Sequence, residues 1–321
     1  MPAITATAPG KVILFGEHAV VYGQPAIAVP VFQVQARAIV TAQPRQPAGS
    51  AWVQAPAIGL DAGLVSLPPQ DPLAFAIHQV YAALGITRPP AYHLRVTSTI
   101  PVAAGLGSGA AVSVAVIRAL SAFLGQPLPL ERVSDLAYEV EKLHHGTPSG
   151  IDNTVIAFGK PVNFAREPGG VRIETFRVAR PFTLVIADTG IPSQTALAVG
   201  DVRRGWQAEP QRYEQLFAAI GSVVRSARQA IESGEVESLG ALMDQNHALL
   251  RELDVSSPEL ERLVSAARQA GAAGAKLSGG GRGGNLIALA SAETGLSIAA
   301  RLLAAGAVNT IVSQVSEQGA R

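Results

Sequence analysis

The chain has 321 residues, with 24 acidic and 25 basic side chains and a formal net charge of +1 at pH 7. This balance offers no basic stripe for a polyanion, so nucleic acid is excluded as the expected partner. The absence of cysteine excludes disulfides, thiol nucleophiles and thiolate zinc sites. The length and the 48% hydrophobic content predict a globular protein with two domains.

The N-terminal segment MPAITATAPGKVILFGEH has no charged region followed by a clean apolar stretch, so we do not interpret it as a signal peptide. No apolar run in the sequence reaches the roughly 18 residues that a membrane span needs. The six histidines show no metal-ligand spacing. We therefore expect a soluble cytoplasmic protein without a membrane partner.

The sequence of the first half of the chain predicts a mixture of strands and helices. Residues 34–41 and 92–98 partly alternate and are rich in β-branched side chains, which favours strands. The proline-rich residues 43–72 show little periodicity and are expected to form an irregular surface excursion.

Two amphipathic helices are predicted next. The first spans residues 108–123, and the second spans 131–145 and ends at a Gly-Thr-Pro sequence. Their apolar stripes consist of Val112, Val116, Leu120 and Phe123 in the first helix and Val133, Leu136, Val140 and Leu143 in the second.

The second half begins, in this interpretation, after a loop-like stretch between about residues 160 and 182. We predict one domain over residues 1–170 and another over 171–321. The expected elements are a buried strand at 183–188, helices at 210–233, 235–253 and 257–270, a glycine-rich turn at 279–284, a strand at 285–290, a helix at 293–305 and a last strand at 308–315.

The segment PVAAGLGSGAA, residues 101–111, has three alternate glycines directly before an amphipathic helix. Glycine lets backbone approach a ligand closely, and a helix start offers free N–H groups and a positive dipole end. The segment thus favours a di- or triphosphate site, although a simple glycine-rich turn is an open alternative. Its spacing fits neither a Walker A loop nor a dinucleotide fingerprint.

Two carboxylates further along the chain are candidate site residues. Glu141 lies beside the apolar stripe of its helix, and Asp152 follows the helix-breaking sequence HGTPSG in an expected loop. Phosphoryl transfer needs a carboxylate for Mg²⁺ and often a second one for the alcohol proton. The alternative interpretation is a solvated helix acid and a turn residue.

Two further segments carry weaker signals. Lys11 stands at the expected entrance of an apolar strand, where an ammonium could stabilise a phosphate or a forming alkoxide, or could be a gatekeeper against aggregation. Residues 276–284, KLSGGGRGG, place five glycines within six positions before a strand. This indicates close packing against a ligand or a loop, with a mobile hairpin as the alternative.

Taken together and in this order, these segments resemble the motifs of the GHMP kinases (galacto-, homoserine, mevalonate and phosphomevalonate kinases). The resemblance covers the chain except residues 43–72. Within the superfamily, the opening APGKVILFGEHAVVYGQPAIA, the segments HGTPSGIDN and VIADTG, and the C-terminal GAKLSGGGRGGNLIAL resemble mevalonate kinases.

The resemblance implies an α+β protein with the two-domain GHMP kinase fold, in which a ribosomal protein S5-like N-terminal domain binds ATP and Mg²⁺ and precedes a ferredoxin-like C-terminal domain. It also implies the C5 hydroxyl of mevalonate as the acceptor, and a homodimer. The implied site residues are Asp152 as base and Lys11 beside it; Pro101, Ala103, Ala104, Gly105, Leu106, Gly107, Ser108, Gly109, Ala110 and Arg203 for ATP; Glu17, His18, Thr189 and Gly280 for substrate; and Ser108 and Glu141 for the metal.

The chain departs from the family at one position. Relatives usually have two serines in the glycine loop, and the second commonly reaches the metal. Here the pair is Ser108-Gly109, so either Ser108 makes that contact or Glu141 and water suffice.

Two alternatives to a mevalonate 5-kinase stay open. One is a GHMP kinase for another alcohol, such as a phosphomevalonate or mevalonate 3-kinase, although the 3-kinase type lacks the pair of Lys11 and Asp152. The other is a catalytically dead relative that binds ligand as a sensor. Such a protein should have lost Lys11, Glu141 or Asp152, and all three are present.

Overall fold

The computed structural model describes residues 3–101, 104–145, 149–167 and 170–317. They form two compact units that interleave along the sequence. The first unit takes its residues from 1–10, 34–101 and 107–159, and the second from 11–33, 102–106 and 160–321. Strands β1 (Ala3–Phe15) and β2 (Ala26–Ala42) each begin in one unit and end in the other. A domain boundary at residue 170 stays a prediction.

The sheet of the first unit is centred on strand β5. Its order is β4 (Leu60–Gly63), β3 (Ala51–Ala55), β5 (Tyr92–Ser98) and the later half of β2. Strand β3 runs parallel to β5, whereas β2 is antiparallel to it. Leu94 lies opposite Val40 on one side and Val53 on the other, and all three are fully buried. This row of β-branched and leucine side chains begins the core.

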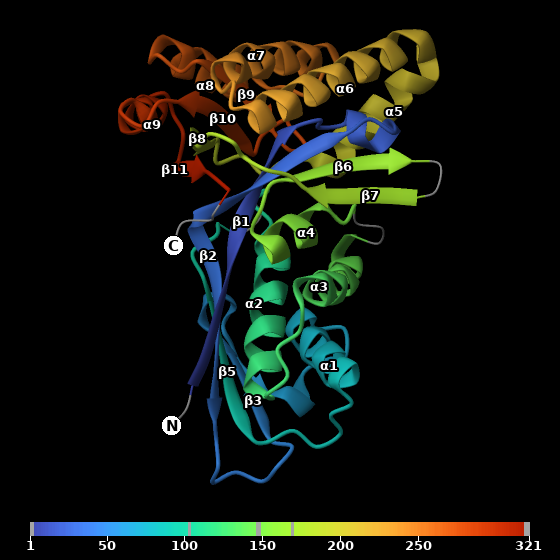
Figure 1. Cartoon of the computed structure of the whole chain (residues 1–321), viewed down its shortest axis with the longest axis vertical. Helices are drawn as coiled ribbons and strands as arrows, with labels where there is room; N and C mark the ends of the chain where they lie inside the picture. Colours follow the sequence, from blue (N-terminus) through green and yellow to red (C-terminus); the bar gives the residue numbers. More distant parts are fainter. Residues whose placement is uncertain (1–2, 102–103, 146–148, 168–169, 318–321) are drawn as a thin grey trace. The chain divides into compact units, whose positions relative to one another are not determined.

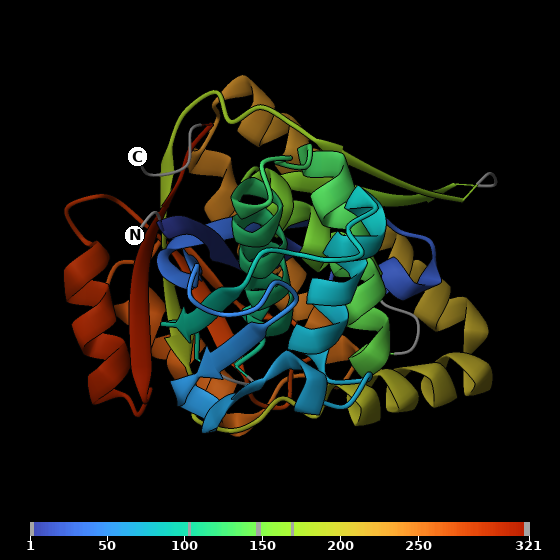
Figure 2. The ribbon, with the colours of Figure 1, turned by 90° about the horizontal axis from the view of Figure 1, so that it is seen from below.

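Four helices complete the first unit: α1 (Pro72–Leu84), α2 (Ser108–Phe123), α3 (Leu130–His145) and α4 (Ile151–Phe158). Helices α1 and α2 lie side by side, and α3 packs against α2 and α4 (Figures 1 and 2). Helix α2 has the predicted range and is buried around most of its circumference. In α3 the predicted stripe is buried except for Leu143, which is exposed.

Two stretches predicted to lack regular structure contain strands. Residues 43–72 contribute β3 and β4, and the loop-like stretch after residue 160 contains β6 (Val162–Glu167) and β7 (Gly170–Thr175). Both predictions were wrong for the same reason. Short strands with weak periodicity gain their hydrogen bonds from neighbours that are distant in sequence, such as β5 for β3 and β2 for β6.

The second unit contains an antiparallel sheet of order β11-β8-β10-β9. Its strands are β8 (Phe182–Asp188), β9 (Gly274–Ser278), β10 (Asn285–Ala290) and β11 (Asn309–Val315). Counted along the chain, this order is 4-1-3-2, which is the ferredoxin-like arrangement predicted for the C-terminal part. Strands β9 and β10 are buried along their whole length.

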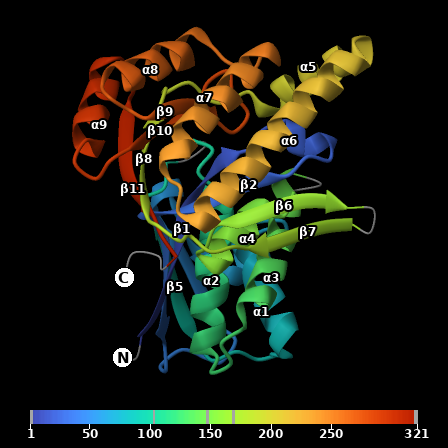
Figure 3. The same cartoon turned by 45° about the horizontal axis from the view of Figure 1, so that its top comes forward.

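Helices α7 (Glu237–Glu252), α8 (Pro258–Gln269) and α9 (Gly295–Ala304) pack on this sheet (Figure 3). Helices α5 (Thr195–Ala208) and α6 (Pro210–Ser233) pack on each other, and α6 also packs on α7. The predicted helices match α6 to α9 within about two residues, whereas α1, α4 and α5 were not predicted. Within the described residues no helix is both long and apolar enough to cross a membrane.

Candidate active site

Two carbonyl groups of the glycine loop accept hydrogen bonds from other parts of the second unit, to which residues 104–106 belong. The Ala104 carbonyl accepts a hydrogen bond from the Asn285 side-chain amide, and the Leu106 carbonyl accepts one from the Lys11 backbone N–H at 2.9 Å. Gly105 and Gly107 both have left-handed backbones, with φ of 72° and 73°. With its carbonyls occupied and its glycines in this conformation, the loop matches the backbone nests that bind anions.

Helix α2 begins directly after this loop without a side-chain cap. Its N-cap is Gly107, and in the described chain no hydrogen bond satisfies the N–H groups of Ser108, Gly109 and Ala110. The Ser108 side chain is half-buried and likewise without a hydrogen bond there. An uncapped helix start offers N–H donors and the positive dipole end to an anion. These free donors suit the predicted phosphate site, which stays a prediction, and Ala103 lies outside the described residues.

Glu141 is buried on α3, so its interpretation as a solvated helix acid was wrong. A Cβ atom built on Gly109 would lie 3.1 Å from Glu141 Oε1. A side chain at position 109 would therefore be crowded against the Glu141 carboxylate. Carboxylate, hydroxyl and water oxygens are the ligands that Mg²⁺ prefers, and Glu141 and Ser108 fit such a shell. Among the described residues, no three His, Asp or Glu side chains gather as a metal cluster.

Asp152 lies in the first turn of helix α4 and not in the loop that the sequence predicted. Gly150, the last residue of the HGTPSG sequence, already serves as the N-cap of α4. The next residue, Asn153, is buried and donates to the backbone and side-chain oxygens of Ser134 on α3, at 3.1 and 2.8 Å. This contact fixes the rotation of α4 and hence the side of the helix that carries Asp152.

Lys11 lies within strand β1, not at its entrance, and its exposed fraction is only 8%. A gatekeeper lysine is useful only when it is exposed at a sheet edge, so that alternative was wrong. The backbone of Lys11 holds the glycine loop through Leu106, as described above. Lys11 therefore links the first strand to the phosphate loop.

The chain turns sharply at Gly16, Glu17 and His18. Gly16 has φ of 97°, and a Cβ there would come within 2.5 Å of the Pro25 carbonyl. His18 also has a positive φ of 60°, which is rare for a residue other than glycine and concentrates at functional sites. The turn buries both Glu17 and His18.

Each of the two buried side chains, Glu17 and His18, makes a hydrogen bond through one of its two polar atoms. Glu17 Oε1 accepts from the Lys276 ammonium, and His18 Nε2 donates to the Gly280 carbonyl at 3.0 Å. Because the carbonyl can only accept, the ring proton of neutral His18 is on Nε2 and Nδ1 has a lone pair. In the described chain, Glu17 Oε2 and His18 Nδ1 are buried without a hydrogen-bond partner.

Burial controls the charge of this pair. It raises the pKa of Glu17, and the nearby Lys276 ammonium opposes that shift. For His18, burial lowers the pKa to about 4, and the bond to Gly280 opposes it only in part. The His18 ring is therefore neutral at pH 7. Two neighbouring acceptors without donors need a partner, because a buried polar atom without one is costly.

The glycine-rich segment 279–284 is a packed loop and not a mobile hairpin. Its one bulky residue, Arg282, has a positive φ of 53°, pairs with the Asp201 carboxylate on α5 and donates to the Asp254 carbonyl at 2.9 Å. A Cβ on Gly283 would lie 2.7 Å from the Ile191 carbonyl. Thr189 donates from its backbone and its hydroxyl to the Gly284 carbonyl, at 2.9 and 2.8 Å. The predicted close packing is therefore confirmed.

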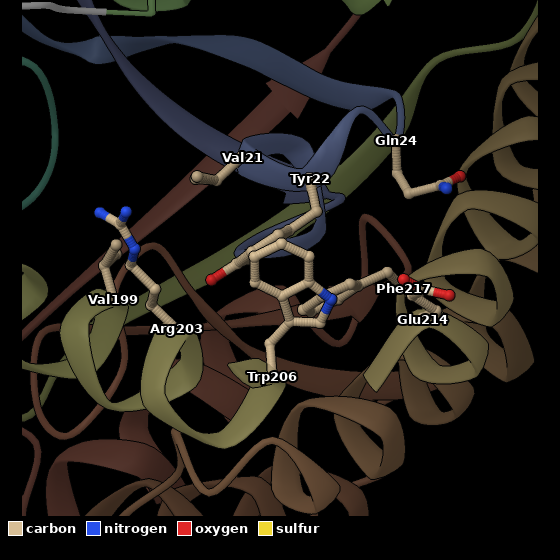
Figure 4. Close-up of a pocket in the computed structure, with 8 residues that line it drawn as sticks. All are labelled: Val21, Tyr22, Gln24, Val199, Arg203, Trp206, Glu214 and Phe217. Atoms are coloured by element: carbon tan, nitrogen blue, oxygen red, sulfur yellow. The ribbon is translucent and has the colours of Figure 1, made fainter. Parts of the chain in front are cut away.

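Arg203 lines a pocket of about 550 Å³ within the second unit. Tyr22 stacks on Phe217 with ring centroids 4.0 Å apart and lies 5.4 Å from the Trp206 ring. Figure 4 shows Arg203 on one side of these rings and Glu214 and Gln24 on the other. The structure thus places Arg203 beside an aromatic cluster, and its contact with phosphate stays a prediction.

Sequence reasoning gave no role to Lys276, Asn285 and Arg282. A signal for Lys276 was present, since it is the only charged residue in a strand that is otherwise apolar or small. Asn285 follows the glycines and opens an apolar strand. The sequence could not reveal that its amide reaches residue 104, since that contact joins positions 181 residues apart.

Comparison with known proteins agrees with this geometry. The profile of the GHMP kinases N terminal domain matches residues 73–160, and that of the GHMP kinases C terminal domain matches residues 227–308. The chain belongs to the GHMP kinases.

Similarity to individual members extends over nearly the full length. A mevalonate kinase of Thermococcus onnurineus is 36% identical over 338 residues, covering 99% of this chain and 98% of the relative. One of Aeropyrum pernix is 35% identical, with the same coverages. The crystal structure of the L. major mevalonate kinase in complex with R-mevalonate has a TM-score of 0.83 and 32% identity, over 98% of this chain and 97% of that one.

Proposed function

We propose that the chain transfers the γ-phosphate of ATP to the C5 hydroxyl of mevalonate, giving 5-phosphomevalonate for isoprenoid biosynthesis. The observation that carries this proposal is the full-length similarity to mevalonate kinases, one of them a structure with R-mevalonate bound. The site supports it, because each chemical part that the reaction needs has candidate residues in the described chain.

Glu17 and His18 are proposed to seat the substrate. Their unpartnered atoms, Oε2 and Nδ1, are both acceptors, which suits a ligand that donates hydrogen bonds. Mevalonate has two hydroxyl groups and can supply such donors. Gly280 contributes through its carbonyl, which fixes the His18 ring.

The glycine loop and the start of α2 are proposed to hold the ATP phosphates. The loop residues are Pro101 to Ala110, and the free N–H groups of Ser108, Gly109 and Ala110 with the dipole end of α2 suit the triphosphate. Thr189 is proposed to lie near the transferred phosphate, and Arg203 to contact phosphate. For Thr189 a supporting observation is that Ser193 and Thr195, which follow it, lie directly beside Gly280.

The chemistry is proposed to run through Asp152 and Lys11. In the transfer, a bond forms between the C5 oxygen and the γ-phosphorus, and the bond from that phosphorus to the β,γ-bridging oxygen breaks. The hydroxyl proton passes to the Asp152 carboxylate. The Lys11 ammonium favours the developing negative charge on the alkoxide or phosphate.

A magnesium ion is proposed to be held by Glu141 with help from Ser108. When bound, such an ion neutralises charge on the phosphates. Gly109 has no hydroxyl to offer the ion, so a water molecule is proposed to take that ligand position. Glu141 is buried and oriented by α3, so it is suited to a fixed ligand role.

The test is a coupled assay of ADP release with mevalonate, phosphomevalonate, homoserine and galactose, each with and without Mg²⁺. We expect Mg²⁺-dependent turnover on mevalonate alone, with 5-phosphomevalonate as the product. Turnover on another alcohol would leave the proposed mechanism in place but show that the proposed substrate is wrong. A folded protein that binds ATP and turns over none of the four would instead be a sensor.

We also propose that the protein works in the cytoplasm and as a homodimer, as GHMP kinases commonly do. Light scattering coupled to size exclusion checks the second proposal. A mass near twice 33.1 kDa is expected, and a mass near 33.1 kDa would contradict it.

A further inference from the structure

Lys276 is a charged residue without contact to solvent. It lies in the middle of strand β9, and its exposed fraction is 0%. Its ammonium donates to Glu17 Oε1 and to the Leu277 carbonyl, the latter at 2.6 Å, and lies 6.0 Å from the centre of the Phe15 ring. The chain has only four lysines, so a buried one is conspicuous.

The surroundings of Lys276 fix its position. Strand β9 pairs with β10, where Lys276 lies opposite Ile287. Ser278, on the same side of the strand, donates to the Ile13 carbonyl of β1 at 2.8 Å. At the edge of β9 away from β10, the Leu277 N–H donates to His247 Nδ1 at 3.3 Å. The ammonium therefore reaches Glu17 from a strand that is held along both edges.

A buried ion pair is an inefficient means of stabilising a fold. Removing two charges from water costs several kcal/mol for each ion, and apolar side chains of similar volume are often as stable. The Glu17–Lys276 pair also leaves Glu17 Oε2 unsatisfied. Packing alone does not explain the buried Glu17–Lys276 pair. A requirement for an ionised Glu17 carboxylate in a fixed orientation explains it.

We propose that Lys276 is a positioning residue for substrate binding: it holds the Glu17 carboxylate by Oε1 in its ionised form, so that Oε2 is left to accept from a substrate hydroxyl. This inference rests on the proposed function of Glu17. A lysine suits the role because its compact ammonium binds one oxygen, whereas a guanidinium tends to occupy both oxygens of a carboxylate.

The pKa directions agree with this geometry. Burial raises the pKa of Glu17 and lowers that of Lys276, and in each case the charge of the partner opposes the shift. If the ammonium is removed, only backbone hydrogen bonds from Glu17 and Gly279 oppose the burial effect, so the pKa of the Glu17 carboxyl should rise further.

The first experiment compares Lys276→Met with wild type and with Lys160→Met, which removes an exposed lysine. We expect Lys276→Met to raise KM for mevalonate at least tenfold at pH 7 while KM for ATP stays within twofold. The mevalonate kcat/KM of this variant should rise with pH from 6 to 9, as Glu17 ionises, relative to the wild-type profile. Equal changes in both KM values, or a pH profile like that of wild type, would overturn the proposal.

The second experiment uses Glu17→Gln alone and together with Lys276→Met. Once Glu17 is an amide, loss of Lys276 should raise KM for mevalonate no further, and the double variant should be more stable than either single one. If Lys276→Met raises KM by the same factor in both backgrounds, Lys276 does not act through Glu17. Where Lys276→Met alone does not fold, the comparison of Glu17→Gln with the double variant still decides, because a further rise in KM for mevalonate would overturn the proposal.

A third measurement separates this inference from the proposed function. The ¹³C shift of the Glu17 carboxyl, titrated without substrate, should show a higher pKa in Lys276→Met than in wild type. An unchanged titration would overturn the role of Lys276 whatever the substrate is. If wild type phosphorylates a different alcohol, the same KM comparisons are made with that alcohol.

Discussion

In the loop at residues 104–109, the groups left for a ligand are backbone N–H donors, whereas around Glu17 they are buried side-chain acceptors. The loop depends on glycine conformations and on carbonyls held by Asn285 and Lys11. The Glu17 region depends on an ion pair and a neutral histidine. In the proposed function, the donors would serve the anionic phosphates and the acceptors would serve the substrate hydroxyls. Ligand binding by the loop should be sensitive to backbone strain. Ligand binding by the Glu17 region should be sensitive to changes of charge.

The largest effect should come from a residue that belongs to neither region. Asp152→Asn should lower kcat by about 10³-fold, because it removes the proton acceptor, while ATP binding stays the same. Steady-state kinetics and a nucleotide-binding titration check this. Asp135→Asn, which changes an exposed acid on α3, is the matched control. Near-normal turnover of the Asp152 variant would remove the assigned base.

A second prediction concerns the charge of His18. Unfolded His18 takes up a proton below pH 6.5, whereas folded His18 does so only near pH 4. The free energy of unfolding should therefore fall as pH drops from about 6.5 to about 4, and His18 should account for up to about 3 kcal/mol of that loss. Urea unfolding of His18→Gln should show a smaller loss than wild type. His78→Gln, at an exposed position, should not. Equal losses in all three proteins would contradict the buried, neutral state of His18.

The loop can be tested through backbone strain alone. Gly105 has φ of 72°, and a Cβ there meets only the Asn285 amide at 3.7 Å, so Gly105→Ala adds strain of about 1 kcal/mol without a clash. We expect KM for ATP to rise about fivefold while KM for mevalonate is unchanged.

Gly85→Ala is the control for strain, because Gly85 has φ of 66° and open space at the C-terminus of α1. It should lower stability by a similar amount without changing KM for ATP. If both variants change KM for ATP equally, the loop has no special role in nucleotide binding.

The smallest effect is expected for Ser108→Ala. Loss of this hydroxyl should lower the rate a few-fold and weaken the dependence on Mg²⁺, because Glu141 and water would still bind the ion. A titration of activity against Mg²⁺ measures this, with the exposed Ser297→Ala as control. An unchanged titration would show that Ser108 does not contact the metal ion.

Features that depend on residues adjacent in sequence were the most predictable from the sequence. Helix α2 begins at Ser108 as predicted, because the glycines before it and the apolar stripe within it are read from neighbouring residues. Glu141 was placed correctly beside the core for the same reason. The antiparallel order of the second sheet followed from the family resemblance and not from the strands themselves.

The failures concern long-range contacts. Lys11 was expected at a strand entrance, but it is buried within β1, and its backbone N–H pairs with the Leu106 carbonyl, 95 positions further on. Strand β3 was expected to be irregular, because its neighbour β5 is about 40 residues away in sequence. The pairing of Glu17 with Lys276 joins positions 259 apart, and no local pattern encodes such a contact.

The interleaved units also set a limit on when the protein can become functional during its synthesis. The segment 102–106 belongs to the second unit, and its Ala104 carbonyl is held by Asn285. A ribosome makes the glycine loop early but Asn285 only near the end of the chain. Domains usually fold in the order of their synthesis, yet here the nucleotide loop has to wait for strand β10. A nascent chain that ends before residue 285 should therefore emerge with its first helices formed and without a finished phosphate site.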